Sequence, residues 1–431
     1  MPATAGSRSP RIALLDNTTN ASYIFAKILR RSGYDADFIQ QRGMPFNHQP
    51  SWEDVDVALP AGEAYAHLSD DTYWEDFERR LGWARPPWVI RPRATVGALA
   101  RLPEVSARLA RAMPAPLLPL GLGLLASSLP IVARLRDYDV VLALGPSAGI
   151  AYAAGRPYAV ITMGWDIFSL PFMTTSRNPL RRARGHLQRR ALADSLQILG
   201  MPSMDLEFLE RLGLGHHLRP FPVPVDVDGY AAIEPGSRAE VFGEEVAARA
   251  EGKLLLFCPS RISFAEKGQD LLLRAFAQVR AEGVSAYLVL LAWGHEAARA
   301  DALIRELHIE DDVRLLPTVF SKHRLIRALR LADIAPIQFI LGGYGTLARE
   351  ALAAGAPVVS SYDREAPQPH PPDDPAPIIA AATVLEIRDA LLRLVGRGAR
   401  EAAAARGREW ARRQHQEAPL REVDRLLAEL R

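Results

Sequence analysis

A glycine-rich segment near the C-terminus has the residue types and spacing of a phosphate-binding turn. Residues 343–359 read Gly-Tyr-Gly-Thr-Leu-Ala-Arg-Glu-Ala-Leu-Ala-Ala-Gly-Ala-Pro-Val-Val, which predicts a turn, a short helix, a glycine stop and an apolar strand. Glycines let backbone N–H groups approach a phosphate, and the helix N-terminus behind them adds roughly half a positive charge. Glu350 lies one turn into this helix, within reach of a ribose attached to that phosphate. The segment predicts a site for a phosphorylated nucleotide or sugar.

Two basic residues upstream would complete such a site. An apolar run at residues 254–258 predicts a buried parallel strand, and Arg261 and Lys267 follow it on the next loop. In open α/β sheets, ligands bind at the carboxyl ends of the strands. Arginine offers a planar fork and lysine a point charge, so the pair suits a diphosphate. The chain has only four lysines. Lys267 is therefore less readily explained as an ordinary surface residue.

Alternating strands and helices must position these side chains. From residue 253 onward, apolar runs alternate with amphipathic stretches up to the glycine-rich turn, which indicates a parallel sheet. At the other end of the chain, a strand at residues 11–16, a helix at 23–32 and a strand at 35–39 form a β-α-β opening. No G-x-G-x-x-G follows the first strand. The sequence predicts an α/β protein without a dinucleotide fingerprint.

With both segments in place, the sequence resembles the GT-B fold glycosyltransferases, specifically the retaining family 4 type of glycosyltransferase group 1. That family typically carries a G-R-x(4–5)-K-G segment, and an E-x7-E segment followed by A-x-A-x-G-x-P-V. Here the first spans residues 260–268, with Ser260 in place of the leading glycine, and the second spans residues 342–358. The resemblance implies two Rossmann-like domains that face each other across a cleft, with a C-terminal helix that crosses back to the N-terminal domain.

The resemblance assigns a role to each residue on the donor side. It implies that Arg261 and Lys267 hold the donor diphosphate and stabilise it as it leaves, which makes them catalytic candidates. It implies that Glu350 accepts hydrogen bonds from the ribose; the alternative is a surface carboxylate paired with Arg349. Main-chain groups would support the phosphates and read the nucleobase at these positions: Gly343, Tyr344, Gly345, Thr346 and Leu347 for the phosphates, and Pro317, Thr318 and Val319 for the base. No metal or other cofactor is then required, and the donor is a UDP-, GDP- or other nucleotide-diphosphate sugar.

Two positions depart from the resembled pattern. The first glutamate of E-x7-E, which usually contacts the donor sugar, is Gly342 here, and Met163 stands where the family often has the histidine of H-G-x-D. Asp166 matches that motif and is either a further catalytic candidate that binds a sugar or acceptor hydroxyl, or a cap for the local turn. On the acceptor and sugar side we place these residues: Asn17, Asn20, Gly164, Trp165 and Asp166.

The implied activity is transfer of a sugar from a nucleotide diphosphate to an acceptor hydroxyl, with retention of configuration. Surface polysaccharide, glycolipid and secondary-metabolite biosynthesis are the settings that this chemistry fits. The changes at Gly342 and Met163 keep open an alternative, in which the protein has lost catalysis and serves as a nucleotide-sugar-binding or scaffold partner.

Residues 221–226 resemble the linker that the family carries between its two domains, so we place the domain boundary there. The N-terminal acceptor-binding domain would span residues 1–222 together with a crossing helix at 412–431. The C-terminal donor-binding domain would span residues 223–411. Residues 40–93 are rich in tryptophan, proline and charge, and we expect them to form loops and short helices on the acceptor side.

The composition indicates a globular chain with room for two cores: of 431 residues 48% are hydrophobic, and the net charge is +2. The single cysteine, Cys258, excludes an intrachain disulfide framework and fits a reducing cytoplasm. Residues 1–10 lack an apolar signal core and predict a short disordered lead-in. His370, Asp373 and Asp374 lack the spacing of metal ligands, so no metal site is expected. We expect a cytoplasmic protein.

Two segments raise the question of a membrane. Residues 114–133 are the most apolar stretch, but prolines interrupt it, so a core or interfacial helix, a membrane-surface contact and a spanning helix are the interpretations, in that order. Arginines cluster at residues 177–190, either as a solvated helix face or as a contact for anionic lipid headgroups. No nucleic-acid-binding motif accompanies them. The expected partners are a nucleotide sugar, an acceptor and, in the second interpretation, the anionic inner face of a membrane.

Overall fold

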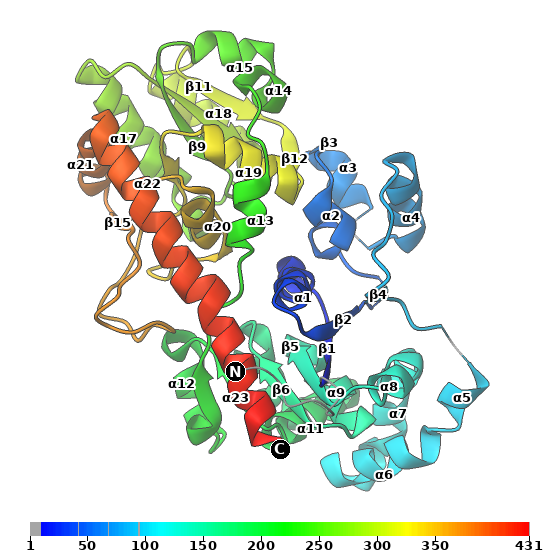
Figure 1. Cartoon of the computed structure of the whole chain (residues 1–431). Coiled ribbons are helices and arrows are strands. Elements are labelled where there is room, and N and C mark those ends of the chain that lie inside the picture. Colours follow the sequence, from blue (N-terminus) through cyan, green and yellow to red (C-terminus); the bar gives the residue numbers. More distant parts are fainter. Residues whose placement is uncertain (1–9, 42, 68, 94, 431) are drawn as a thin grey trace.

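The computed structural model describes residues 10–41, 43–67, 69–93 and 95–430. Two α/β regions lie one above the other, and the last two helices run from the upper region to the lower one (Figure 1). The lead-in expected at residues 1–10 lies outside the described residues except for Pro10, and so does Arg431 at the end of the expected crossing helix.

The lower region is built on a parallel seven-stranded sheet in the order β4-β2-β1-β5-β6-β7-β8. Its strands are β1 (Arg11–Leu15), β2 (Asp35–Ile39), β4 (Val89–Ile90), β5 (Val140–Leu144), β6 (Tyr158–Ile161), β7 (Ile198–Gly200) and β8 (Leu218–Pro220). Its helices are α1 (Ala21–Arg31), α5 (Val96–Leu99), α6 (Leu102–Ala112), α7 (Leu118–Ala126), α8 (Leu129–Leu135), α9 (Ala148–Ala154), α10 (Trp165–Phe168), α11 (Pro179–Ala193) and α12 (Pro202–Arg211). The β-α-β opening expected from the sequence is confirmed.

Successive residues of β1 enter different cores, because side chains alternate across a strand. Ala13 and Leu15 join one buried cluster with α6, α8, α9 and α11. Ile12 and Leu14 join another with α1 and with the last helix of the chain. A strand buried on both faces has to be apolar throughout, which accounts for the continuous run in its sequence.

The upper region contains the parallel sheets β11-β10-β9 and β13-β14-β15, joined by a bridge between Leu256 and Ile334. Its strands are β9 (Leu254–Cys258), β10 (Ala286–Leu291), β11 (Val313–Leu316), β12 (Thr318–Phe320), β13 (Ala335–Pro336), β14 (Val358–Ser360) and β15 (Ile379–Ala380). Its helices are α13 (Val227–Ala232), α14 (Arg238–Phe242), α15 (Glu244–Arg249), α16 (Phe264–Lys267), α17 (Gln269–Ala281), α18 (Ala297–Glu306), α19 (Lys322–Leu331), α20 (Thr346–Ala354), α21 (Val384–Arg393) and α22 (Arg397–Ala411). The expected alternation of strands and helices is confirmed.

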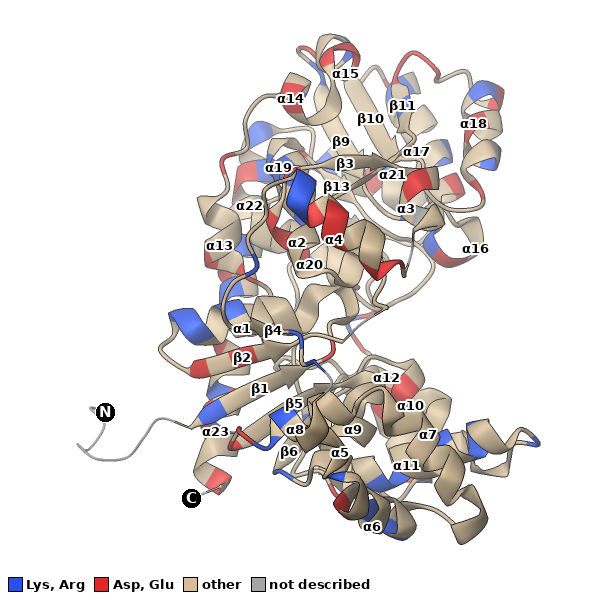
Figure 2. Cartoon of the chain, turned by 90° about the vertical axis from the view of Figure 1, so that its right-hand side faces the viewer, with Lys and Arg blue, Asp and Glu red and all other residues tan. Residues whose placement is uncertain are grey.

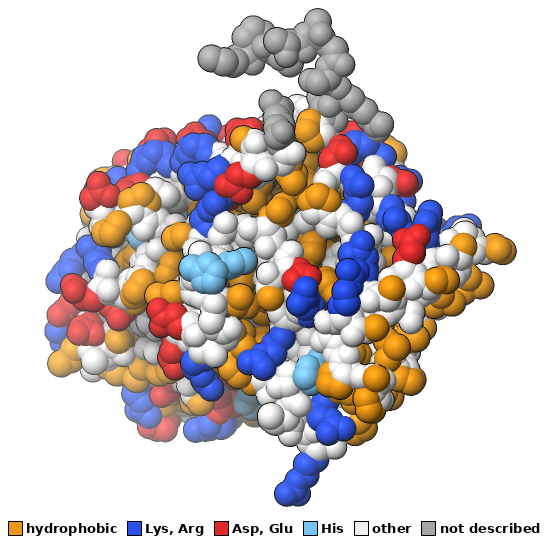
Figure 3. Space-filling model, turned by 90° about the horizontal axis from the view of Figure 1, so that it is seen from below, with side chains coloured by type: hydrophobic (Ala, Val, Ile, Leu, Met, Phe, Trp, Pro, Cys, Tyr) orange, Lys and Arg blue, Asp and Glu red, His pale blue; other side chains and the backbone are white. Residues whose placement is uncertain are grey.

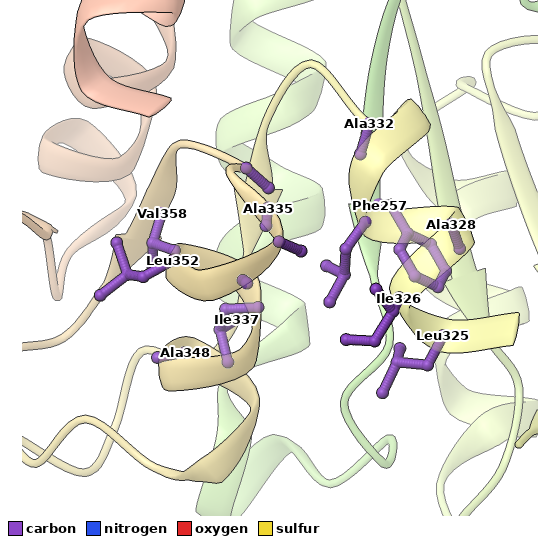
Figure 4. Close-up of a cluster of buried hydrophobic side chains, with 14 of the residues drawn as sticks. Phe257, Leu325, Ile326, Ala328, Ala332, Ala335, Ile337, Ala348, Leu352 and Val358 are labelled. Atoms are coloured by element: carbon purple, nitrogen blue, oxygen red, sulfur yellow. The ribbon is translucent and has the colours of Figure 1, made fainter. Parts of the chain in front are cut away.

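Apolar packing fixes the helix that follows the glycine-rich turn. Ala348 and Leu352 of α20 belong to the same buried cluster as Phe257 of β9 and Ile326 of α19. Figure 4 shows these side chains, with α19 beside Phe257 and α20 beside Ile337. Because α20 is anchored along its length, its N-terminus and the turn before it have a defined position at the carboxyl end of the sheet.

The C-terminal helices tie the two regions together. After α22, a π-helical turn (Arg412–Glu417) leads into α23 (Ala418–Glu429). Val423, Leu426 and Leu427 of α23 pack in the cluster that holds Phe25 and Phe221 of the lower region. The crossing of the C-terminal helix back to the N-terminal part, implied by the resemblance, is confirmed. The domain boundary at residues 222 and 223 stays a prediction.

Residues 46–67 and 69–81, which we call the bridging segment, are placed differently from expectation. They form α2 (Pro50–Asp54), β3 (Ala58–Pro60), α3 (Ala61–Ala66) and α4 (Asp71–Arg80). The short helices were expected, but β3 pairs antiparallel with β12 of the upper region, with Leu59 opposite Val319 (Figure 1). Asp56 forms ion pairs with Arg324 and Arg327 of α19. Strand pairing and ion pairs thus carry this N-terminal segment across to the C-terminal sheet.

The apolar stretch at residues 114–133 forms α7, which packs against α6 and α11, and most of α8, which packs against α5 and α9. Among the residues that the structure describes, no single helix combines the length and hydropathy of a membrane span. The pieces Ala115–Ala126 and Leu129–Leu135 meet those limits only when taken together, and they bend by 79° at their junction.

Candidate active site

A glutamine links Lys267 to the glycine-rich turn. Lys267 ends α16, and its Nζ donates a hydrogen bond to Oε1 of Gln338 at 2.8 Å. The amide of Gln338 in turn donates to the carbonyl of Gly343 at 2.7 Å. Burial lowers the pKa of Lys267. Gln338 was not among the sequence-predicted residues; its signal is a buried polar side chain between Ile337 and Phe339.

A cavity of about 520 Å³ lies between the two regions. From the upper region, Lys267, Gln338 and residues 341–346 line it, and from the lower region Met163 and Gly164 do so. The structure therefore brings together the predicted diphosphate lysine, the glycine-rich turn and the end of β6. We call this the sugar-side cavity. Much of its remaining wall is apolar, with Met201, Met204 and Phe221 among its residues.

A second cavity, of about 180 Å³, lies on the other side of the turn and is called the base-side cavity below. Its upper-region walls come from Pro259, Trp293, Val319, Leu347 and Glu350. The lower region supplies four residues, three of them from the bridging segment: Thr19, Phe46, Asn47 and Trp52. Aromatic and apolar walls around a few polar groups are typical of a nucleobase site.

Among the residues that the structure describes, Thr346 alone lines both cavities. It is the first residue of α20, and Gly345 before it is the N-cap. An added Cβ at Gly343 would meet no atom within 4 Å, so the turn has open space beside it. An elongated ligand that occupies both cavities must cross the N-terminus of α20, where unpaired backbone N–H groups and the helix dipole favour a phosphate.

Glu350 is buried and engaged, with 1% of its surface exposed. Lys322 at the start of α19 donates to Oε1 of Glu350, while Oε2 has no hydrogen-bond partner within the described part of the chain. The alternative expectation, a surface carboxylate paired with Arg349, is wrong. Nearby Glu53 of the bridging segment feels the charges of Lys322 and Glu350, and burial raises its pKa to about 8. The ribose role of Glu350 stays a prediction.

Arg261 lies outside both cavities in this conformation. Its guanidinium forms an ion pair with Glu266, and it lines a shallow surface depression with Gly294 and His295. The structure thus brings Lys267, but not Arg261, to the glycine-rich turn. The diphosphate role of Arg261 stays a prediction that requires the guanidinium to leave Glu266.

The predicted phosphate and base residues differ in what their side chains do. Tyr344 is fully buried among the rings of Tyr362 and Trp410, so only its main chain faces the sugar-side cavity. Val319 lines the base-side cavity. The carbonyl of Pro317 already accepts a hydrogen bond from the N–H of Ala61 at 3.1 Å. Because Thr318 and Val319 pair with β3, fewer of their main-chain groups are free to bind a base than the sequence suggests.

The acceptor-side candidates from the end of β6 are arranged around a tight turn. Gly164 lines the sugar-side cavity and has φ = +110°, while Trp165 is 42% exposed. Asp166 is buried, and its Oδ1 accepts a hydrogen bond from the N–H of Met163 at 3.0 Å. Burial raises the pKa of Asp166 to about 7. These contacts favour the turn-cap interpretation of Asp166, and its binding of a hydroxyl stays a prediction.

The two asparagines of the β1–α1 turn serve the turn itself. Oδ1 of Asn17 accepts from the N–H of Tyr23 at 2.9 Å, and its amide donates to Asn20. Thr19 between them lines the base-side cavity. Thr19 and Asn20 both have positive φ, which costs free energy in non-glycine residues and often accompanies a functional site.

Comparison with known proteins identifies the segment that holds Lys267 and the turn. Residues 244–368 match the family model described as "Glycosyl transferases group 1". This part of the chain is similar to the group 1 glycosyltransferases. A D-inositol 3-phosphate glycosyltransferase of Mycolicibacterium smegmatis is 34% identical over 140 residues, which cover 30% of this chain and 31% of that protein. An enzyme of the same name from Nocardia farcinica is 32% identical over 150 residues, or 32% of this chain and 33% of its own length. The chain thus spans about a third of the length of these curated relatives.

Solved structures match over nearly the whole chain. The Anabaena protein HepE in complex with UDP has a TM-score of 0.57 at 14% identity, with 97% of this chain and 100% of that chain covered. A sucrose-phosphate synthase from Thermosynechococcus elongatus has a TM-score of 0.57 at 15% identity, with 98% and 99% covered. At these identities the similarity establishes the fold, which is GT-B with parallel sheets in both halves.

Both departures from the family pattern face the sugar-side cavity. Gly342 and Met163 line it. An added Cβ at Gly342 would lie 3.3 Å from Cβ of Asp363, and Asp363 also lines the cavity. A carboxylate is therefore present beside the position where the family has a glutamate, but a different residue supplies it. Within the described ranges, no group of three His, Cys, Asp or Glu side chains is arranged to hold a metal ion.

Proposed function

We propose that this protein transfers a sugar from a nucleotide diphosphate to an acceptor hydroxyl. The observation that carries the proposal is the position of Thr346 between the two cavities, with Lys267 on the sugar side and Glu350 on the base side. A nucleotide sugar would place its base and ribose in the base-side cavity, its diphosphate across the N-terminus of α20 and its sugar beside Lys267.

Electrostatic stabilisation of the leaving group would drive the reaction. As the glycosidic bond breaks, positive charge spreads over the sugar ring and negative charge collects on the diphosphate. Lys267, oriented by Gln338, and the N–H groups at the start of α20 are fixed donors for that charge. With these donors no metal ion is required, and the departing phosphate would help to deprotonate the acceptor, giving retention of configuration.

The donor proposal is a UDP-, GDP- or other nucleotide-diphosphate sugar. It has support from the HepE structures, which contain UDP, UDP and glucose, or UDP-glucose. We further propose that Asp363 binds a hydroxyl of the donor sugar, because it is the carboxylate next to Gly342 on the cavity wall. Its side chain is exposed and accepts a hydrogen bond from the N–H of Glu365 at 2.9 Å.

For the acceptor we propose a hydroxyl compound that is lipid-linked or otherwise apolar, handled at the cytoplasmic face of a membrane. Val96 and Leu99 of α5 and Leu102 of α6 are exposed at the outer end of the lower region. Figure 2 marks basic positions along α6 and α11. Figure 3, which views the molecule from below, shows hydrophobic side chains gathered on one side next to Lys and Arg. An apolar edge beside basic residues suits an anionic surface.

Donor hydrolysis with a panel of nucleotide sugars tests the proposed function. Release of a nucleoside diphosphate from one member of the panel, faster with an acceptor hydroxyl present, is the expected result. Tight binding without turnover would instead favour the alternative of a catalytically inactive nucleotide-sugar-binding protein, which the Gly342 and Met163 positions suggest. The absence of both binding and turnover would contradict the proposal.

A further inference from the structure

Arg349 is a buried cation that forms no ion pair with any described residue. It lies in α20, and only 6% of its surface is exposed. Its one hydrogen bond within the described chain runs from Nη2 to Oγ1 of Thr346, at 2.8 Å. Its Nε is buried without a partner, and no described carboxylate lies within ion-pair distance of it. The structure therefore leaves Nε of this guanidinium without a hydrogen bond among the described residues.

Proteins rarely leave a buried charge in that state. Transfer of a charge from water costs free energy, so buried arginines are normally paired with a carboxylate or fully hydrogen-bonded. Glu350, the neighbour in sequence, forms no ion pair with Arg349, because consecutive helix residues point in different directions and Glu350 pairs with Lys322. Burial lowers the pKa of the Arg349 guanidinium.

The rings packed around Arg349 supply no negative charge. Oη of Tyr344 and Nε2 of His415 are also buried and unpartnered among the described residues. His415 bonds through Nδ1 to the carbonyl of Val223 at 2.8 Å, and burial lowers its pKa well below the ordinary value. Histidine and tyrosine are neutral under these conditions. The positive charge of Arg349 is thus not cancelled by this cluster.

The position of Arg349 suggests what compensates for it. Arg349 lines the sugar-side cavity together with Lys267 but does not line the base-side cavity. Its hydrogen bond goes to Thr346, the residue shared by both cavities. Because the hydroxyl of Thr346 accepts from Arg349, the hydroxyl proton is free to donate to a ligand. Guanidinium and hydroxyl together form an anion-binding pair on the sugar side of the turn.

We propose that Arg349 binds an anionic oxygen of the ligand in the sugar-side cavity, together with the Thr346 hydroxyl. The chemistry is that of a phosphate or carboxylate. Its source is either the sugar-side phosphate of the donor or an acidic group on the transferred sugar or acceptor. This inference rests on the proposed function, since it assumes that a nucleotide sugar occupies the two cavities.

Calorimetric titration of nucleotides tests the inference. UDP and GDP would be compared with UMP and GMP on the wild-type protein and on Arg349→Met, Arg349→Lys and Thr346→Val. If the anion is the donor's sugar-side phosphate, Arg349→Met should weaken diphosphate binding by about tenfold or more and change monophosphate binding little. Arg349→Lys should recover part of the loss. Arg400→Met is the matched control, because Arg400 pairs with Asp333 away from both cavities.

A turnover arm distinguishes the second source of the anion. Unchanged nucleotide binding, combined with an about tenfold loss of kcat/KM for an acidic donor such as UDP-glucuronate but not for UDP-glucose, places the anion on the sugar. An about tenfold rise in the KM for an acidic acceptor, with nucleotide binding unchanged, places the anion on the acceptor. If binding and turnover are unchanged in Arg349→Lys and Arg349→Met, both folded by circular dichroism, the arginine is structural and the inference is wrong. If the wild-type protein binds no nucleoside diphosphate, the proposed function fails first.

Discussion

Lys322 at the start of α19 donates to the buried carboxylate of Glu350 in α20, and both line the base-side cavity. The ion pair holds Glu350 at the wall of this cavity and leaves Oε2 without a partner among the described residues. A carboxylate that is fixed in place but has a free oxygen is prepared to accept a ribose hydroxyl.

Replacement of Glu350 tests this role. Glu350→Gln should weaken UDP binding by roughly tenfold, because a charge-assisted hydrogen bond contributes about 1.5–3 kcal/mol. The same variant should lose the preference for UDP over 2′-deoxy-UDP. Titration of both nucleotides measures the two effects.

A stability control separates binding from folding. Glu350→Gln leaves Lys322 buried without its partner, which lowers stability. The double variant with Lys322→Met should recover stability but not ribose selectivity. A double variant that discriminates UDP from 2′-deoxy-UDP as well as wild type does would show that Glu350 does not contact the ribose.

Lys267 should be the most sensitive side chain for turnover. Lys267→Met removes the donor that we propose stabilises the leaving diphosphate, for an expected cost of about 2.7–4 kcal/mol, or roughly 10²–10³ in kcat. Steady-state release of the nucleoside diphosphate measures it. Lys253→Met is a suitable control, since Lys253 pairs with Asp312 on another face of the domain. Equal rates for the two variants would remove Lys267 from the mechanism.

The open space beside Gly343 predicts a steric block. Gly343→Val should leave the melting temperature nearly unchanged, because an added Cβ meets no atom within 4 Å. It should nevertheless abolish binding of nucleoside diphosphates by filling the path across the turn. Gly396→Val is the matched surface control, with equally open space at the start of α22. A Gly343→Val protein that binds UDP normally would contradict the predicted phosphate path.

The buried Glu53 predicts a pH dependence of stability. Burial raises its pKa from the ordinary 4.5 to about 8 in the folded protein, so the folded state holds a proton that the unfolded state releases between these values. The free energy of unfolding should therefore fall as pH rises from about 5 to 8. Glu53→Gln should flatten this part of the profile and be relatively more stable at pH 8.5. Denaturant titrations at pH 5.5 and 8.5 measure the free energy of unfolding of both proteins. The same change in this free energy between the two pH values for wild type and Glu53→Gln would contradict the prediction.

The sequence predicted the parts of the molecule that depend on local pattern. Apolar runs, helix periodicity and glycine stops located β1, β2, β9 and β10 and the helix at Glu350, because the rules behind them act over a few residues. The residue order around Lys267 and the glycine-rich turn indicated a shared site, and the structure places them on one cavity.

The sequence did not reveal contacts between distant segments. The pairing of Leu59 with Val319 joins residues far apart in the chain, and neither short strand has a distinctive pattern. The ion pair of Lys322 with Glu350 depends on the packing of α19 against α20. The sequence also did not predict the burial of Arg349, because an arginine in a short helix is normally expected on a solvated face. These features follow from tertiary packing.

The position of the phosphates in a crystal structure with bound nucleoside diphosphate tests the central claim most directly. We predict that the diphosphate lies at the N-terminus of α20, in contact with Thr346 and Lys267, with the base beside Trp52 and Val319. Phosphates bound instead in the surface depression of Arg261, Gly294 and His295, with both cavities empty, would contradict it.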